Sequence, residues 1–178
     1  MTSDGNRFDG TYQGVVVSNV DPLGLDRLLV RIGDVLGDEP VWASASTAAP
    51  SMNVVPLINS GVWVEFQDGD LSRAVWTGFR RDVRQEGPPV ANSILPGVPQ
   101  IVLGTPQPAV GTLPQNYLLI TEQPGPTGGI QLQIQGPAGP CIKLNETGIE
   151  LSCGPGLASI RLTGTSVVIN NGTFIIPK

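Results

Sequence analysis

The chain has 178 residues, of which 15 are acidic and 10 are basic, so its formal net charge is −5. It contains no histidine, which excludes Ser-His-Asp and Cys-His catalytic sites, His-ligated zinc and histidine proton relays. Glycine and proline account for 40 residues and leave little room for long helices, so we expect an all-β protein.

The charges are distributed unevenly along the chain. Residues 1–86 contain 12 acidic and 7 basic residues and therefore carry the whole net charge. Residues 87–178 contain only three acidic and three basic residues. That is too few to coat an ordinary monomeric domain, in which about a quarter to a third of surface positions are charged. Either this half is disordered, or other chains cover much of its surface.

The first part of the chain, residues 1–86, is predicted to form a compact β domain. A turn with the sequence DPLG separates the first two of its strands, and no segment shows a convincing helical period. Five strands within about 70 residues suggest a small closed barrel such as an OB-fold. We expect Trp42, Trp63 and Trp76 to lie in its core. The predicted strands cover residues 12–20, 27–32, 41–45, 62–66 and 74–79.

The middle of the chain is rich in proline. Residues 87–126 contain nine prolines, a density that forbids helix and leaves only short strands between the breaks. Residues 101–103 and 117–120 could each form one such strand. We interpret residues 87–126 as a semi-rigid spacer that lies against another part of the structure.

The last part, residues 127–178, is predicted to consist of short strands and turns. Apolar and polar residues alternate in segments that are closed by Gly-Pro, Thr-Gly or Asn-Gly, and strands start every 7 to 11 residues. Such narrow apolar faces cannot give a lone chain of about 50 residues a core.

Three identical chains wound about one axis would give these strands a core and would pair their backbone edges. The alternative is a sandwich or meander that continues the first domain. We favour an intertwined homotrimer, because both the lack of charge and the regular turns agree with it. The residues expected to line its axis are Ile149, Leu151, Ile160, Leu162, Val167 and Ile169.

Several segments resemble the phage baseplate assembly protein V family, which includes the central spikes of contractile phage tails and of type VI secretion. The YQGVVVSNVDPLGLDRLLV segment at residues 12–30 is similar to the opening of that family's OB-fold. VWA at residues 41–43, GVWVEF at residues 61–66 and the DGD turn at residues 68–70 resemble its later elements. The turn-rich tail is similar to the family's triple-stranded β-helix needle.

The resemblance implies a non-enzymatic central spike, without cofactors, that plugs the hub of a contractile-tail baseplate. Its partners would be two copies of itself, the hub protein and, transiently, the target membrane. We expect assembly in the bacterial cytoplasm, since no signal peptide or membrane span is evident, and location in the baseplate of a virion or injection particle. The apolar end of the chain, with Phe174, Ile175 and Ile176, would dock a separate tip protein.

Two features of some relatives do not carry over. No lysozyme domain fits between barrel and needle, because only the proline-rich segment lies there. The His-x-His iron site at the tip of several relatives also has no counterpart in a chain without histidine.

The rival function is binding of single-stranded nucleic acid by the OB-fold, which needs stacking aromatics and a basic groove. Arg80, Arg81 and Arg84 form a small basic cluster, but the net charge of −5 opposes a phosphate backbone. We therefore expect these arginines to contact the hub or another partner, and we expect no nucleic acid.

Two remaining groups of residues are interpreted as structural. Glu65, Asp68 and Asp70 surround one turn, and Asp-Gly-Asp is common turn chemistry, so we assign them neither catalysis nor a metal ion. Cys141 and Cys153 match no metal-binding or disulfide spacing and are expected to be small, buried and reduced.

Overall fold

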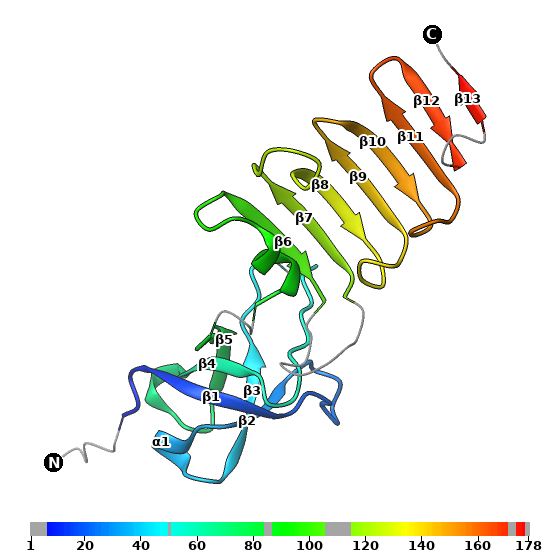
Figure 1. Ribbon diagram of the computed structural model, residues 1–178. Helices are drawn as coiled ribbons and strands as arrows, with labels where there is room; N and C mark the ends of the chain where they lie inside the picture. Colours follow the sequence, from blue (N-terminus) through cyan, green and yellow to red (C-terminus); the bar gives the residue numbers. More distant parts are fainter. Residues whose placement is uncertain (1–6, 50, 84–86, 106–114, 171–173, 177–178) are drawn as a thin grey trace, which may run out of the picture. The chain divides into compact units, whose positions relative to one another are not determined.

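The computed structural model describes residues 7–49, 51–83, 87–105, 115–170 and 174–176. The chain divides into two compact units, residues 1–82 and 83–178. Each of them is built on β-strands, and each is described by itself below (Figure 1). No helix in the described parts of the chain is long and apolar enough to cross a lipid bilayer.

The first unit contains a closed five-stranded barrel, which confirms the predicted architecture. Its strands follow one another around the barrel in the order β1-β2-β3-β5-β4, and β1 pairs with β4 to close it. All of these pairings are antiparallel except the parallel pairing of β3 with β5. The strands are β1 (Thr11–Ser18), β2 (Leu28–Arg31), β3 (Pro40–Ala45), β4 (Gly61–Phe66) and β5 (Ala74–Phe79).

Alternation along these strands fills the barrel with small and medium apolar side chains. In β4, Val62 and Val64 are fully buried, whereas Trp63 between them points to the other face and is half-buried. Trp76 lies in the core, but Trp42 is also only half-buried. The prediction of three core tryptophans is therefore wrong for Trp42 and Trp63, because the strand period sets the face and aromatic character does not. The buried core consists of Val16, Leu28, Val30, Ile32, Ala43, Val62, Val64, Phe66, Ala74 and Trp76.

Two short helical turns link barrel strands. The four-residue helix α1 (Gly33–Leu36) follows β2, and the 3-10 helix η1 (Gln67–Gly69) forms the turn between β4 and β5. Asp68 in that turn has a φ of +57°, a left-handed conformation that aspartate tolerates better than most residues.

The turn after β1 is organised by the carboxylate of Asp21, whose side chain is 2% exposed. It accepts hydrogen bonds from the backbone N–H groups of Leu23 and Leu25, both at 3.0 Å, and from that of Arg27. The Arg27 guanidinium binds both carboxylate oxygens, at 2.8 and 2.9 Å, and also lies 5.1 Å from the ring centre of Trp42. These bonds explain why the chain has aspartate at this position.

The Asp21 carboxylate should make barrel stability depend on pH. The hydrogen bonds from Arg27 and the backbone lower its pKa below that of the unfolded chain, which is about 3.9. Its contribution is therefore complete above that unfolded value and is lost as the pH falls from about 4 towards the folded pKa. Asp21→Asn should melt earlier than the wild type at pH 7, and the difference should shrink in acid.

Thermal unfolding monitored by circular dichroism at pH 7 and pH 3 measures this effect. Asp38→Asn is the control, because Asp38 is fully exposed and lies 3.9 Å from Arg31. A pH-independent difference between wild type and Asp21→Asn would contradict the assignment.

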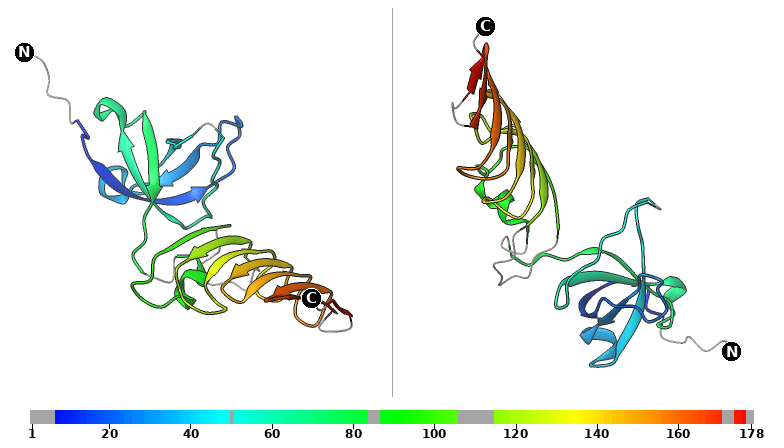
Figure 2. Two further views of the ribbon diagram at one scale, coloured as in Figure 1. Left: turned by 90° about the horizontal axis from the view of Figure 1, so that it is seen from above. Right: turned by 90° about the vertical axis from the view of Figure 1, so that its right-hand side faces the viewer.

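The second unit contains one eight-stranded antiparallel sheet, in which neighbouring strands follow each other in chain order from β6 to β13 (Figure 2). Each strand from β7 to β12 pairs with its own chain on both edges. The strands are β6 (Gln100–Gly104), β7 (Tyr117–Thr121), β8 (Gly129–Gln133), β9 (Cys141–Asn145), β10 (Gly148–Ser152), β11 (Ser159–Thr163), β12 (Ser166–Ile169) and β13 (Phe174–Ile176).

This sheet begins earlier than the predicted boundary at residue 127. Strands β6 and β7 form its first hairpin, although both lie within the segment interpreted as a spacer. Between barrel and sheet, the structure places the short 3-10 helix η3 (Pro89–Ser93). The prolines of this region lie in the connections, so they did not prevent strands from forming between them.

The strands β8 to β11 form an internal repeat that the short strand-turn pattern concealed. GIQLQ in β8 and GIELS in β10 begin with Gly129 and Gly148, which are 19 positions apart. Each of these glycines approaches a backbone carbonyl of the following strand so closely that a Cβ atom would overlap it. The carbonyls belong to Leu144 and Leu162, respectively, so the close approach is repeated with the sequence.

Candidate assembly surface

One face of the eight-stranded sheet carries two continuous rows of apolar side chains, which together we call the apolar face. Directly opposite residues of neighbouring strands point to the same side, so the register defines each row. The first row is Ile101, Ile120, Ile130, Leu144, Ile149, Leu162, Val167 and Ile176, and the second is Leu103, Leu118, Leu132, Ile142, Leu151, Ile160, Ile169 and Phe174.

Most of the apolar face is exposed in a single protomer. Eleven of its leucine and isoleucine side chains are exposed, with fractions between 38% at Ile149 and 64% at Leu103. A surface of this size is far larger than the single apolar residues that are normal on soluble proteins, and it marks an interaction site.

The structure brings all six predicted axial residues onto this face. Ile149 opposes Leu162, and Leu151 opposes Ile160, while Val167 and Ile169 continue the two rows on β12. The sequence reasoning did not include the matching residues of β6 to β9. Register could have found those of β8 and β9, which have the same alternation.

The opposite face of the sheet is polar along most of its length. Its central row passes from Gln131 through Lys143 and Glu150 to Arg161. The Arg161 guanidinium lies 3.4 Å from the Glu150 carboxylate. The sheet therefore has one face suited to water and one suited to a protein partner.

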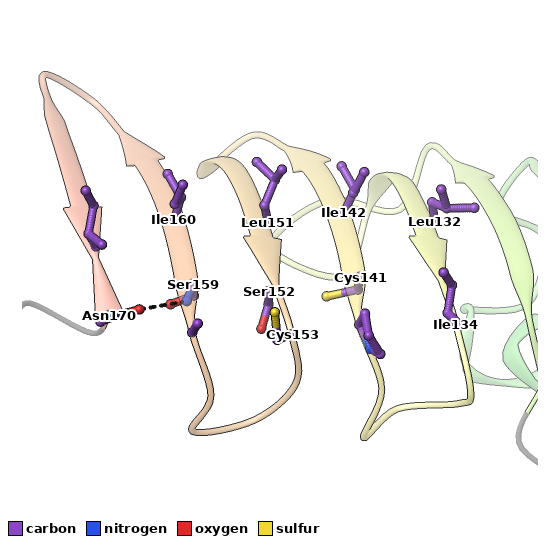
Figure 3. A pocket seen from close by; sticks show the side chains of 13 residues that line it. Leu132, Ile134, Cys141, Ile142, Leu151, Ser152, Cys153, Ser159, Ile160 and Asn170 are labelled. Atoms are coloured by element: carbon purple, nitrogen blue, oxygen red, sulfur yellow. Dashed lines mark hydrogen bonds between the residues drawn. The ribbon is translucent and has the colours of Figure 1, made fainter.

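An open, almost wholly apolar groove of about 520 Å³ follows the second row of the apolar face (Figure 3). Leu132, Ile142, Leu151 and Ile160 stand along it on one side of four successive strands. Its other lining residues are Ile134, Pro140, Cys141, Ser152, Cys153, Ala158, Ser159, Ile169 and Asn170.

Both cysteines are free thiols that line this groove, and the prediction that they are buried is wrong for a single protomer. Cys141 is half-buried and Cys153 is exposed. Cys153 follows Leu151 by two positions, and its N–H donates to the carbonyl of Ala158 at 2.9 Å, so it extends the strand pairing beside the apolar rows.

A buried glutamine holds the loop between β8 and β9, and sequence reasoning missed it. Gln133 is 2% exposed, and its Nε2 donates to the carbonyls of Gly136 at 2.5 Å and Gly139 at 3.0 Å. Its Oε1 accepts from Gln131, which also donates to the hydroxyl of Tyr117 at 3.0 Å. Burial raises the pKa of that tyrosine. A glutamine in an alternating strand gives no signal of this role, because its loop partners follow it irregularly.

The predicted basic cluster is only partly available to a partner. Arg80 donates to Gln13 at 3.1 Å and pairs with Asp82 at 2.5 Å, and its side chain is only 18% exposed. Arg81 is exposed, while Arg84 lies outside the described residues. The structure therefore gives Arg80 a role within the barrel.

The predicted tip-docking residues form the last strand of the sheet. Phe174, Ile175 and Ile176 make up β13, in register with Ile169, Val168 and Val167 of β12. The sheet thus ends on an apolar edge strand.

The acidic residues near the β4–β5 turn act separately from one another. Glu65 accepts a hydrogen bond from Thr11, Asp68 pairs with Arg73, and Asp70 accepts bonds from the backbone and hydroxyl of Ser72. The bonds from Ser72 lower the pKa of Asp70. No group of three or more potential metal ligands occurs among the residues that the structure describes.

Comparison with known families assigns both units. The model of the type VI secretion system and phage-baseplate injector OB domain matches residues 12–80, which span the barrel. The model of the phage baseplate V C-terminal trimerisation domain matches residues 100–175, beginning at the first residue of β6. A comparison with curated proteins found no match. The chain therefore belongs to the phage baseplate V family and joins an injector OB domain to a trimerisation domain.

Proposed function

We propose that the chain is the central spike of a contractile injection particle, a homotrimer whose barrels plug the tube hub and whose sheets form a needle. The observation that carries this proposal is the apolar face, which ends a trimerisation domain and has nothing to cover it within the protomer. The baseplate family supports the location of the particle's spike at the baseplate.

The energetics of the apolar face suit a permanent trimer. Burying a half-exposed leucine or isoleucine contributes roughly 1 kcal/mol, and the eleven exposed ones together contribute about 10 kcal/mol per protomer before the cost of association. Backbone groups of the interior strands are already paired within the chain, so contacts between chains run through side chains. Three twisted sheets that wind about a common axis would give the expected triple-stranded β-helix.

A mechanical role follows from this arrangement. On sheath contraction the needle would be driven into the target envelope, so it contacts the membrane only transiently. Separating three sheets requires their apolar faces to be exposed together, which makes unfolding slow and the spike resistant to force. The apolar edge strand β13 would dock a tip protein, and Arg81 on the barrel remains a candidate contact for the hub.

Binding of single-stranded nucleic acid is the alternative function of the barrel, and the structure offers it little. Trp76 is buried in the core, so it cannot stack on a base. Arg80 is engaged by Gln13 and Asp82, and residues 1–86 carry the full net charge of −5. We therefore propose the non-enzymatic spike and no nucleic-acid partner.

Two measurements on the wild-type protein test the proposal. Light scattering should give about three times 18.6 kDa, and the unheated oligomer should resist SDS. An antibody against the chain should then label only the baseplate end of intact tails in electron micrographs. A stable monomer, or tails without label, would overturn the spike. Tight, salt-sensitive binding of a labelled single-stranded DNA would favour the nucleic-acid alternative.

A further inference from the structure

A second apolar surface lies on the barrel, apart from the strands that form its wall. It consists of the β1–β2 loop, residues 19–27, and the β3–β4 loop, residues 46–60, which together we call the barrel-loop surface. Its most exposed apolar side chains are more than half exposed, which is unusual for leucine and valine. The exposed members are Val20, Leu23, Leu25, Met52, Val54, Val55 and Ile58, with exposed fractions from 38% to 73%.

The two loops are joined to each other and to the barrel. The Asn19 side chain donates to the carbonyl of Pro56 at 2.8 Å, and Pro56 itself is fully buried. At the base of the loops, Asn59 and Val16 are joined by a backbone hydrogen bond of 2.8 Å. The two loops therefore lie side by side and form one surface.

The barrel-loop surface is held in place before any partner arrives. Asp21 fixes the backbone of Leu23 and Leu25 through its buried carboxylate, so these apolar side chains are presented to water by a rigid turn. Because the loop is already ordered, docking on it costs little conformational entropy. A rigid apolar loop that fills no core of its own protomer is the arrangement expected of a contact surface.

Charge indicates what this surface contacts. Residues 46–60 contain no charged residue, and Asp21 is neutralised by Arg27, whereas the rest of the barrel is acidic. A basic partner would gain most on the acidic surfaces. A second acidic barrel, in contrast, can approach closely only where no like charges meet, and the barrel-loop surface is uncharged.

We propose that the barrel-loop surfaces of the three protomers pack on one another, as a second homotypic contact besides the apolar face of the sheets. This inference rests on the proposed trimer. The trimerisation domain, which begins at residue 100, holds three barrels at high local concentration. A small apolar contact then suffices, because the second association is intramolecular, with an effective concentration in the millimolar range.

Hydrogen–deuterium exchange on the full-length protein tests the contact. In the wild-type trimer, peptides covering residues 19–25 and 51–58 should exchange about tenfold more slowly than in the double variant Leu23→Asp/Val55→Asp, a factor that corresponds to about 1.4 kcal/mol. The double variant should remain a trimer by light scattering, since its sheets are unchanged, and its radius of gyration should increase as the barrels separate.

Thr77→Asp is the matched control, because it adds the same charge at an exposed position of β5, outside both loops. It should retain the slow exchange and the wild-type radius of gyration. Equal exchange of the loops in the wild type and the double variant, within intact trimers, would overturn this inference and leave the spike unaffected. Protection that arises only when purified baseplate hub is added would assign the surface to the hub and overturn the inference as well. A monomeric wild-type chain would overturn the proposed function itself.

Discussion

Replacing Leu162 by aspartate should abolish trimer formation. Leu162 lies in the first row of the apolar face, opposite Ile149 and Val167, and is 40% exposed in the protomer. Losing its apolar contact costs about 2 kcal/mol per protomer, or about 6 kcal/mol per trimer, which lowers the association constant roughly 10⁴-fold. Burying three unpaired carboxylates near one axis adds several kcal/mol more. Light scattering should therefore show a monomer of 18.6 kDa.

Thr163→Asp is the control for this variant. Thr163 is the next residue of the same strand, so it points to the polar face and introduces the same charge away from the proposed axis. It should form trimers as well as the wild type does. A stable, trimeric Leu162→Asp variant would contradict the axial position of Leu162, whereas loss of trimers in both variants would indicate that β11 no longer folds.

The strands could be predicted where alternation and turn residues agree. Both signals are strong in β8 to β11, and there the predicted strands and the side on which their apolar residues lie are confirmed. The barrel strands were equally clear, because short apolar runs end at Pro-Gly and Asp-Gly turns. Local sequence is sufficient in these segments because each strand pairs with its neighbour in the chain.

Proline masked the first hairpin of the sheet. Composition alone made residues 87–126 resemble a spacer, yet Ile101 and Ile120 oppose each other in β6 and β7 and begin the first apolar row. Proline removes a backbone donor only at its own position, so a segment can be rich in proline and still contain strands. The pairing of β7 with β8 shows this, but a one-dimensional pattern does not contain it.

Burial depends on the assembly, which the sequence of one protomer does not specify. Cys153 was expected to be buried because cysteine usually is, but it lies exposed beside the apolar face. The apolar face shows the same difference at larger scale, since its residues have core composition and surface exposure. In both cases residue type predicts the environment in the proposed trimer, and the protomer alone leaves it open.

Replacing Gly148 by alanine should destabilise the sheet strongly. Gly148 begins β10 with a φ of +137°, and an added Cβ would overlap the carbonyl oxygen of Leu162 on β11. The two strands would have to separate, and the hairpin beside the proposed axis would lose its register. We expect a loss of about 3 kcal/mol or more per protomer, in the range reserved for overpacking and backbone strain together. Thermal unfolding of the trimer, followed by circular dichroism, measures this loss.

Gly164→Ala separates the two causes of that effect. Gly164 has a φ of +53°, but nothing lies within 4 Å of where its Cβ would be. Its replacement therefore tests backbone strain without steric overlap and should cost only about 1 to 2 kcal/mol. If both variants lose the same stability, the close approach of Gly148 to Leu162 is not a constraint on the fold. A much larger loss for Gly148→Ala would show that the spacing between β10 and β11, and with it the alignment of Ile149 and Leu162 in one apolar row, depends on that glycine.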